Sequence, residues 1–373
     1  MKFFLFGIIP AFDLLANLII FSSDINPSFD LNQVAEFSLI LAISVIISAF
    51  VFGGIEQAID HKSSIPTILI GRKEWVIIIC LFFVILIASI VVYELDYLTK
   101  IISLACLLGF RGLGRAALYA ENKISLEAMI SAFELIILLT FLFMKMSIFE
   151  SYIFSKTPGV LIRLKFLMNL KHCKLDRKNF IGYSISSGMP AIYLNAFYLF
   201  LPLLNVPNGI IVQFRYIQTL IFPIAFLGGL YARANIVFKS KLSNFGIFRH
   251  LSLHQTKSLP LSILVPIASV SIYVLIVIKA LDLSMAIWLL LTCYCILFYF
   301  RAHSYSLLTI NLGPIYRGSM SFFGVILMCL SAIFLNYLEY IGIIQLYLAL
   351  LVIELILLVS TMILLVLRGG KHA

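Results

Sequence analysis

The sequence predicts an all-α polytopic membrane protein with about twelve transmembrane helices in two six-helix bundles that are related by an internal repeat. Composition is the first reason, because 62% of the 373 residues are hydrophobic and only 12% are charged. Soluble domains are about 45–50% apolar and about 25% charged. The second reason is a series of apolar runs, each near the roughly 20 residues that cross a bilayer as a helix. Such a chain leaves no room for a soluble catalytic domain.

The apolar runs follow one another along the whole chain, separated by short segments that are rich in charged residues, Pro or Gly. The first run begins after Lys2 and continues through Pro10 and Asp13 without a small-residue cleavage site, so we interpret it as a span and not as a signal peptide. The predicted spans are 3–21, 38–56, 75–93, 98–118, 125–146, 149–168, 180–204, 209–231, 259–279, 284–301, 318–338 and 341–367.

The sixth predicted span is the least regular. Lys156, Pro158, Gly159, Arg163 and Lys165 all fall inside it. A broken or interfacial helix at 149–168 is therefore an alternative to a full span, and the chain then has ten or eleven crossings instead of twelve.

The distribution of cations predicts the topology. With both termini in the cytoplasm, every Lys and Arg falls in an inner segment except Lys100, Lys145, Lys156, Arg215 and Lys279. Cytoplasmic loops of membrane proteins carry such an excess of cations. The net charge of +10 is thereby explained without a nucleic-acid partner. We expect an N-terminal bundle at 1–170, a basic cytoplasmic linker at 171–179 and a C-terminal bundle at 180–373.

The two halves carry a short internal similarity. Pro10-Ala11 in the first predicted span aligns with Pro190-Ala191 in the seventh, at an offset close to half the chain length. Six spans in each half would make the repeats parallel, an arrangement that transporters use.

Three carboxylates are predicted to lie near the middle of the bilayer, where a charge costs about 2.5–3.5 kcal/mol on insertion scales. Asp13 is ten residues into the first span, which is about 15 Å at 1.5 Å per residue. Glu134 and Glu354 lie near the centres of the fifth and twelfth spans. They are candidates for cavity carboxylates that couple transport to H⁺ or Na⁺; the alternative is a structural ion pair or hydrogen bond. No other cofactor and no metal site are predicted.

Candidate substrate contacts are cations and amides. Arg215, in the eighth span, could bind phosphate oxygens bidentately, or it could snorkel to the outer interface. Arg111 and Arg115 share one helix face and could attract an anionic headgroup, with cytoplasmic anchoring as the alternative. Asn17 and Asn195 could donate to sugar hydroxyls or hydrogen-bond between helices. For the pair Arg163 and Lys165 we favour anchoring.

Two stretches of the chain are similar to a known family. They are Ile185-Ser-Ser-Gly-Met-Pro190, followed by Asn205-Val-Pro-Asn-Gly209 and Phe214-Arg-Tyr-Ile217, and the earlier stretch Arg111-Gly-Leu-Gly-Arg-Ala-Ala117. They resemble polysaccharide repeat-unit flippases, the Wzx-type O-antigen exporters of the multidrug/oligosaccharidyl-lipid/polysaccharide exporter superfamily. Twelve helices in two bundles match essentially the whole chain.

The resemblance implies a function. The protein would be a flippase, not an enzyme, and would move undecaprenyl-pyrophosphate-linked oligosaccharide repeat units across the bacterial inner membrane. Arg215 and Arg111 would line a cationic cavity between the bundles and contact the pyrophosphate or acidic sugars. A polysaccharide polymerase and a chain-length regulator would be partners.

Three other classes compete with this interpretation. A drug or small-solute exporter of the same superfamily would share the fold, and Asp13 and Glu134 suit a cationic substrate. A membrane polysaccharide polymerase would resemble proteins with a long outer loop, which this chain lacks. A major-facilitator transporter would carry a Gly-Asp-Arg-type motif between the second and third spans, where this chain reads Asp60-His-Lys-Ser-Ser-Ile-Pro66.

Overall fold

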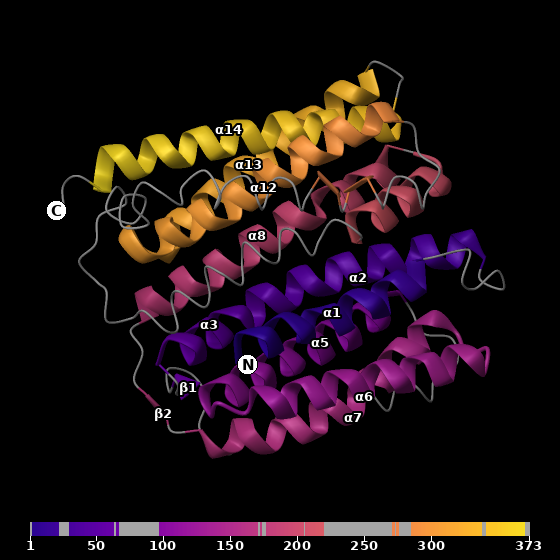
Figure 1. Ribbon diagram of the computed structural model, residues 1–373, viewed down its shortest axis with the longest axis vertical. Coiled ribbons are helices and arrows are strands. Elements are labelled where there is room, and N and C mark those ends of the chain that lie inside the picture. Colours follow the sequence, from indigo (N-terminus) through magenta and orange to yellow (C-terminus); the bar gives the residue numbers. More distant parts are fainter. Residues whose placement is uncertain are drawn as a thin grey trace. The chain divides into compact units, whose positions relative to one another are not determined.

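The computed structural model describes residues 2–21, 30–62, 65–66, 97–170, 172–173, 177–204, 206–219, 271–272, 274–275, 285–337 and 341–369. The chain divides into two compact units, Met1–Tyr216 and Ile217–Ala373. The helices of the first unit are α1 (Lys2–Phe21), α2 (Leu31–Val51), α3 (Gly53–Lys62), α5 (Tyr97–Ala120), α6 (Ile124–Phe143), α7 (Ile148–Asn169) and α8 (Arg177–Leu203). Those of the second are α12 (Met285–Asn311), α13 (Pro314–Tyr337) and α14 (Ile343–Gly369). The predicted all-α class is confirmed (Figure 1), with one short parallel pairing of the two-residue strands β1 (Ile65–Pro66) and β2 (His172–Cys173) beside the helices.

The predicted spans correspond to these helices over most of the described chain. Three predicted spans lie wholly or partly outside the described residues. The structure does not describe 75–93, describes only residues 271–272 and 274–275 of 259–279, and describes 209–231 only as far as residue 219. Five described helical segments are long and apolar enough to cross a membrane: Leu31–Val51, Tyr97–Ala120, Ile124–Phe143, Pro314–Tyr337 and Ile343–Leu367. The first compact unit includes α8 and ends at Tyr216, beyond the predicted linker at 171–179. The division of the chain into two bundles at this linker stays a prediction.

The region predicted as the second span, 38–56, contains two helices. Helix α2 begins at Leu31 because Asp30 caps it, with a side-chain oxygen that accepts a hydrogen bond from the Asn32 N–H at 3.2 Å. The helix ends at Val51, and Phe52 separates it from α3. Helix α2 packs against α5 and α8, and α3 packs against α5 and α8 as well.

The sixth predicted span is one continuous helix, α7, despite the Pro and the charges inside it. Its start is a capping box, in which Ser147 accepts from the Glu150 N–H at 3.3 Å and its hydroxyl donates to the Glu150 carboxylate at 2.7 Å. Helix α7 packs against α5 and α6, and Figure 1 shows α6 and α7 side by side. Two of its cations, Lys156 and Arg163, are buried and therefore need partners from other helices.

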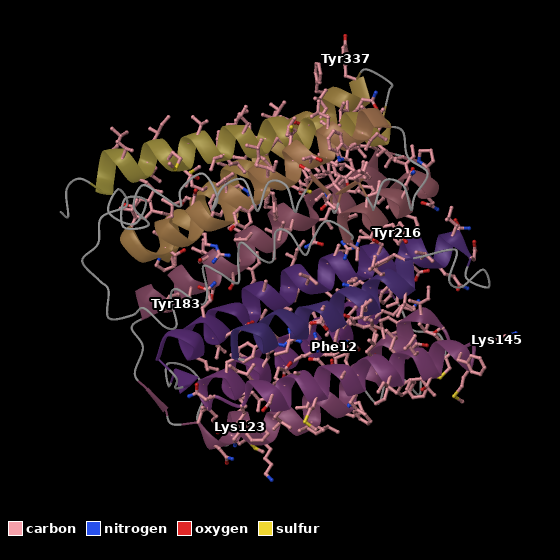
Figure 2. All side chains as sticks on the ribbon, in the orientation of Figure 1. Phe12, Lys123, Lys145, Tyr183, Tyr216 and Tyr337 are labelled. Carbon is pink, nitrogen blue, oxygen red and sulfur yellow. The ribbon has the colours of Figure 1, made fainter. Side chains whose placement is uncertain are left out.

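Helix α6 shows the pattern of a membrane span. Lys123 caps its beginning and Lys145 follows its end, and Figure 2 shows these two side chains at opposite ends of the helix. Between them, Met129 and Ile136 leave 69% and 60% of their surface exposed. Large apolar side chains exposed along a helix whose ends are cationic fit a lipid-facing surface.

In the second unit, α12, α13 and α14 pack against one another. Helix α12 runs to Asn311, ten residues beyond the predicted end at 301. It ends at a turn in which Gly313 has a positive φ of 102°, a backbone conformation that favours glycine, and Pro314 then begins α13. Arg301, predicted to lie at an inner helix end, is instead buried within α12.

Candidate functional site

The first unit contains a buried cluster of charged side chains, which we call the charge network. Helix α1 supplies one member, and α5, α6 and α7 supply two each. Its members are Asp13, Arg111, Arg115, Glu127, Glu134, Lys156 and Arg163.

Helical periodicity explains why these residues meet. Arg111 and Arg115 are four residues apart on α5 and therefore share a face. On α6 the carboxylates are seven apart, and on α7 the cations are seven apart, which is close to two turns of 3.6 residues. Helices α5 and α7 each thus present two cations on one face, and α6 presents two carboxylates that contact cations of both helices.

Glu134 lies at the centre of the network and is fully buried. One of its carboxylate oxygens, Oε2, accepts from Arg111 Nη2 at 2.7 Å and from Lys156 Nζ at 3.2 Å, while Oε1 accepts from Arg163. Three cations on one carboxylate satisfy its acceptor sites and offset the loss of hydration that burial imposes.

Asp13 is the most accessible carboxylate of the network, with 26% of its side chain exposed. It accepts from Arg111 Nη2 at 2.5 Å, from Arg115 Nη2 at 3.0 Å and from Lys156 Nζ at 3.5 Å. Asp13 therefore ties α1 to α5 and α7. A structural ion pair was the alternative to a coupling role that the sequence left open for Asp13, and the structure contains such pairs.

Glu127 forms the other end of the network. It accepts from Arg163 Nε and Nη2, both at 2.7 Å, in a bidentate pair, and from Arg115 Nε at 2.8 Å. The Ser131 hydroxyl also donates to it at 3.1 Å. Arg163 is fully buried, so the preference for an interfacial anchoring role was wrong for this residue; Lys165, by contrast, is exposed.

The charges of the network do not cancel. Four cations face three carboxylates, which leaves a formal surplus of one positive charge. Removing one partner of a buried ion pair typically lowers the free energy of unfolding by about 3–5 kcal/mol, because the other charge stays buried without compensation. The arrangement can therefore staple four helices together, and its surplus charge favours anions over cations nearby.

Arg215 lies in the same unit, on the helical segment 208–219. Its Cζ atom is 4.3 Å from the centroid of the Tyr198 ring and 5.4 Å from that of Phe21, and its Nη1 donates to Asn195 Oδ1 at 3.3 Å. The side chain is half-buried. Asn195, which lies on α8, thus brings two of the predicted substrate-contact residues together, although the sequence did not predict this pairing.

The remaining predicted residues have separate surroundings. Glu354 on α14 accepts from Arg301 Nε on α12, and the Arg301 guanidinium lies 4.5 Å from the Phe298 ring centroid. Asn195 also donates to the Ala191 carbonyl of its own helix at 2.8 Å. Asn17 is half-buried on α1. Glu127, Lys156 and Arg163 were not predicted as site residues, although the seven-residue spacing of Glu127 from Glu134 and of Lys156 from Arg163 was a usable signal.

The close approach of α5 to α7 depends on Gly114. A Cβ atom added there would collide with Arg163 Cβ and would lie 3.3 Å from the Arg163 backbone carbonyl carbon. We expect Gly114→Ala to lower the free energy of unfolding by about 1–3 kcal/mol through overpacking, although Ala is the better helix former. Thermal unfolding of the purified protein measures this. Gly209→Ala, whose added Cβ would lie 4.0 Å from its nearest neighbour, should be neutral; an equal loss in both variants would contradict the explanation.

No protein-family model matches the sequence, and no curated protein matches it. Solved structures do resemble it. An outward-facing multidrug resistance MATE family transporter of the MOP superfamily is 12% identical, with 99% of this chain and 94% of that chain covered and a TM-score of 0.57. A MATE structure in the bent conformation is 11% identical, with 100% and 94% covered and a TM-score of 0.56.

A third similar structure is a MOP superfamily transporter from Pyrococcus furiosus. It is 12% identical, with 99% of this chain and 94% of that chain covered and a TM-score of 0.55. The binding pocket of that protein is described as having a reversed polarity, which suggests a different function for it. These likenesses show the fold: the chain has the fold of MATE transporters, which have twelve transmembrane helices in two bundles.

Proposed function

We propose that this protein is a flippase that carries undecaprenyl-pyrophosphate-linked oligosaccharide repeat units across the bacterial inner membrane by alternating access, and that it is not an enzyme. The fold of MATE transporters supports a transport function. The stretches around Arg111 and Arg215 that resemble repeat-unit flippases support the substrate class.

The observation that carries the proposal is the surplus of buried positive charge. The charge network holds four cations against three carboxylates, and the same unit holds a further half-buried cation, Arg215, and a half-buried carboxylate, Glu56, whose oxygen lies beside α5 at Gly112. A pyrophosphate carries the opposite charge, so its entry into such a unit is favourable, whereas a cationic drug would be repelled. The similar structure with a pocket of reversed polarity supports the idea that transporters of this fold differ in the charge of their substrates.

The roles of individual residues follow from their exposure. We propose that Arg215, half-buried over Tyr198, contacts the phosphate oxygens. Arg115, whose side chain is 19% exposed, is better placed than the 8% exposed Arg111 to exchange a carboxylate for a phosphate. Asn17 and Asn195 are proposed to donate to sugar hydroxyls.

Coupling to H⁺ or Na⁺ through Asp13, Glu134 or Glu354 is part of the proposal. Each of these carboxylates contacts at least one Arg in this structure. A coupling cation would therefore have to displace an existing ion pair, and Asp13, the most exposed of the three, is the proposed point of entry.

The test uses purified protein in proteoliposomes with two substrates. One is a fluorescent undecaprenyl-pyrophosphate oligosaccharide, whose sidedness is read by a sugar-oxidising reagent that cannot cross the bilayer; the other is a membrane-permeant cationic dye. We expect the protein to equilibrate the lipid-linked sugar between leaflets and to leave the dye gradient unchanged. An undecaprenyl glycoside without pyrophosphate, as the matched control, should move much more slowly. Movement of the dye alone would establish the drug-exporter alternative, which the partly exposed Asp13 favours.

A further inference from the structure

A small cavity lies at one end of the first unit, which the predicted topology places at the outer surface. It has a volume of about 210 Å³, room for about seven waters at about 30 Å³ each. The first turns of α2, the end of α8 and the segment 208–219 form its walls. Its polar lining is Asn32, Glu36, Ser38, Tyr198 and Asn208, and its apolar lining includes Leu39 and Ile211.

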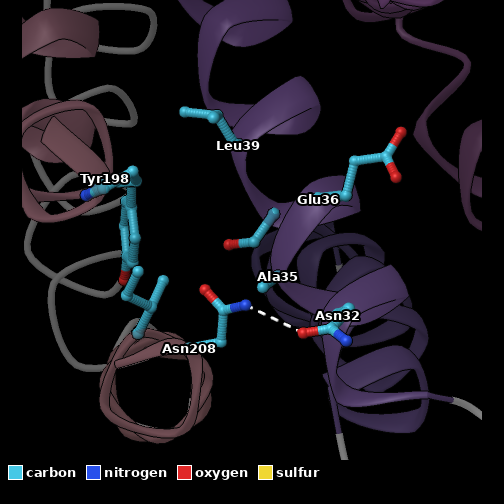
Figure 3. A pocket seen from close by; sticks show the side chains of 9 residues that line it. Asn32, Ala35, Glu36, Leu39, Tyr198 and Asn208 are labelled. Atoms are coloured by element: carbon cyan, nitrogen blue, oxygen red, sulfur yellow. Dashed lines mark hydrogen bonds between the residues drawn. The ribbon is translucent and has the colours of Figure 1, made fainter. Parts of the chain in front are cut away.

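Apart from Glu36, the polar groups of this cavity are neutral. Asn208 Nδ2 donates to Asn32 Oδ1 at 2.9 Å, and both residues are exposed at the rim (Figure 3). Glu36 also lines the cavity, but its carboxylate pairs with Lys100 Nζ at 3.0 Å. Figure 3 shows the Glu36 carboxylate directed away from Tyr198 and Asn208. A charged ligand would therefore find no unneutralised counter-charge among these lining residues.

One hydroxyl in the lining, Ser38 Oγ, lacks a partner within the described part of the chain, and Ser38 is 1% exposed. The hydroxyl of Tyr198, which is 2% exposed, interacts with the Arg215 guanidinium. A buried hydroxyl without a hydrogen bond costs about 1–3 kcal/mol in mutational data, so such groups indicate a ligand or water that completes them. The Arg215 guanidinium lies over the Tyr198 ring at 4.3 Å from its centroid, so the cavity and Arg215 share this aromatic side chain.

We infer that this cavity binds one sugar ring of the glycan. A pyranose ring is uncharged, has hydroxyls that both donate and accept hydrogen bonds, and has an apolar face. These properties match the polar side chains and the aliphatic side chains that line the cavity. The inference rests on the proposed function and deepens it, since Tyr198 would place the sugar in this cavity beside the phosphate contact at Arg215.

The test measures sugar binding without transport. The probes are the repeat-unit oligosaccharide, released from its lipid by mild acid, and inorganic pyrophosphate, each applied to the full-length protein in nanodiscs and followed by saturation-transfer NMR. We expect Ser38→Ala and Asn208→Ala to weaken oligosaccharide binding about twofold to tenfold, the range for one lost hydrogen bond. Pyrophosphate binding should not change. Ser319→Ala, which removes an exposed hydroxyl that donates to the Ile315 carbonyl at 3.0 Å, is the matched control.

Stability separates a ligand-binding hydroxyl from a structural one. Because Ser38 Oγ has no partner among the described residues, Ser38→Ala should leave the melting temperature unchanged or raise it. A lower melting temperature in proportion to lost binding, or unchanged oligosaccharide binding in both variants, would overturn the inference and leave the cavity to water. If wild-type protein moves no lipid-linked sugar but binds the oligosaccharide in a Ser38-dependent way, the proposed function fails and the sugar site stands.

Discussion

Replacing Glu134 by Gln is expected to lower the free energy of unfolding by about 3–5 kcal/mol, the typical effect of breaking a buried ion pair. Glu134 is fully buried and contacts Arg111, Lys156 and Arg163. Its neutralisation leaves four buried cations against two carboxylates, so the repulsion among them is no longer offset. The yield of monodisperse protein after detergent extraction and its melting temperature measure the effect.

Two variants test whether charge is the cause. Glu150→Gln neutralises an exposed carboxylate in the capping box of α7 and should lower stability by less than about 1 kcal/mol. Adding Lys156→Met to Glu134→Gln removes one of the uncompensated cations and should restore part of the lost stability. If Glu134→Gln is as stable as the wild type, the charge network does not hold these four helices together.

Replacing Arg215 by Ala is expected to reduce the flipping rate about 10-fold to 150-fold, the range for a lost hydrogen bond to a charged group, with less than a twofold loss of folded protein. The side chain is half-buried, its hydrogen bond to Asn195 is 3.3 Å long, at the weak end of the range, and it lies over the rings of Tyr198 and Phe21. Because a partly exposed cation–π contact contributes only about 0.5–1 kcal/mol, removal of the side chain should affect substrate contact more than packing. Flipping per folded molecule in proteoliposomes is the readout.

Arg215→Lys is the matched control because it keeps the positive charge and loses the planar, bidentate guanidinium. We expect it to recover part of the activity of the Ala variant. A loss of folded protein in Arg215→Ala that equals the loss of flipping would make Arg215 a structural residue that holds α8 through Tyr198 and Asn195.

The fold could be predicted because bilayer thickness and helix geometry set the length of each apolar run. The bounds of α1, α6 and α14 differ from the predicted spans by at most about three residues at either end. The end of α12 could not be predicted in this way, because Arg301 was interpreted as a helix end. Its partner Glu354 comes from α14, and the pair allows the helix to continue through a buried charge.

The candidate site was predictable only in part. The shared face of Arg111 and Arg115 followed from helical periodicity, whereas the depth of Asp13 in the bilayer stays a prediction from the rise per residue. The position of Arg163 did not, because the positive-inside rule assigns cations to helix ends from linear distance and takes no account of partners on other helices. Which helix faces which depends on tertiary packing, and the periodicity of each helix taken alone does not reveal it.

The cavity beside Tyr198 shows the same limit in another form. Its lining comes from residues near 35, 200 and 210, and none of these three stretches forms a motif by itself. The unpartnered hydroxyl of Ser38 becomes visible only when the neighbouring helices are in place.

The most direct test of the central claim is the pool of lipid-linked oligosaccharides in cells that lack this protein. Its sidedness would be read with a sugar-modifying reagent that cannot cross the membrane. We expect single, unpolymerised repeat units to accumulate on the cytoplasmic face. Accumulation on the outer face would show that transport is intact and that a polymerase is missing, and an unchanged pool would favour the solute exporter; either result would contradict the flippase.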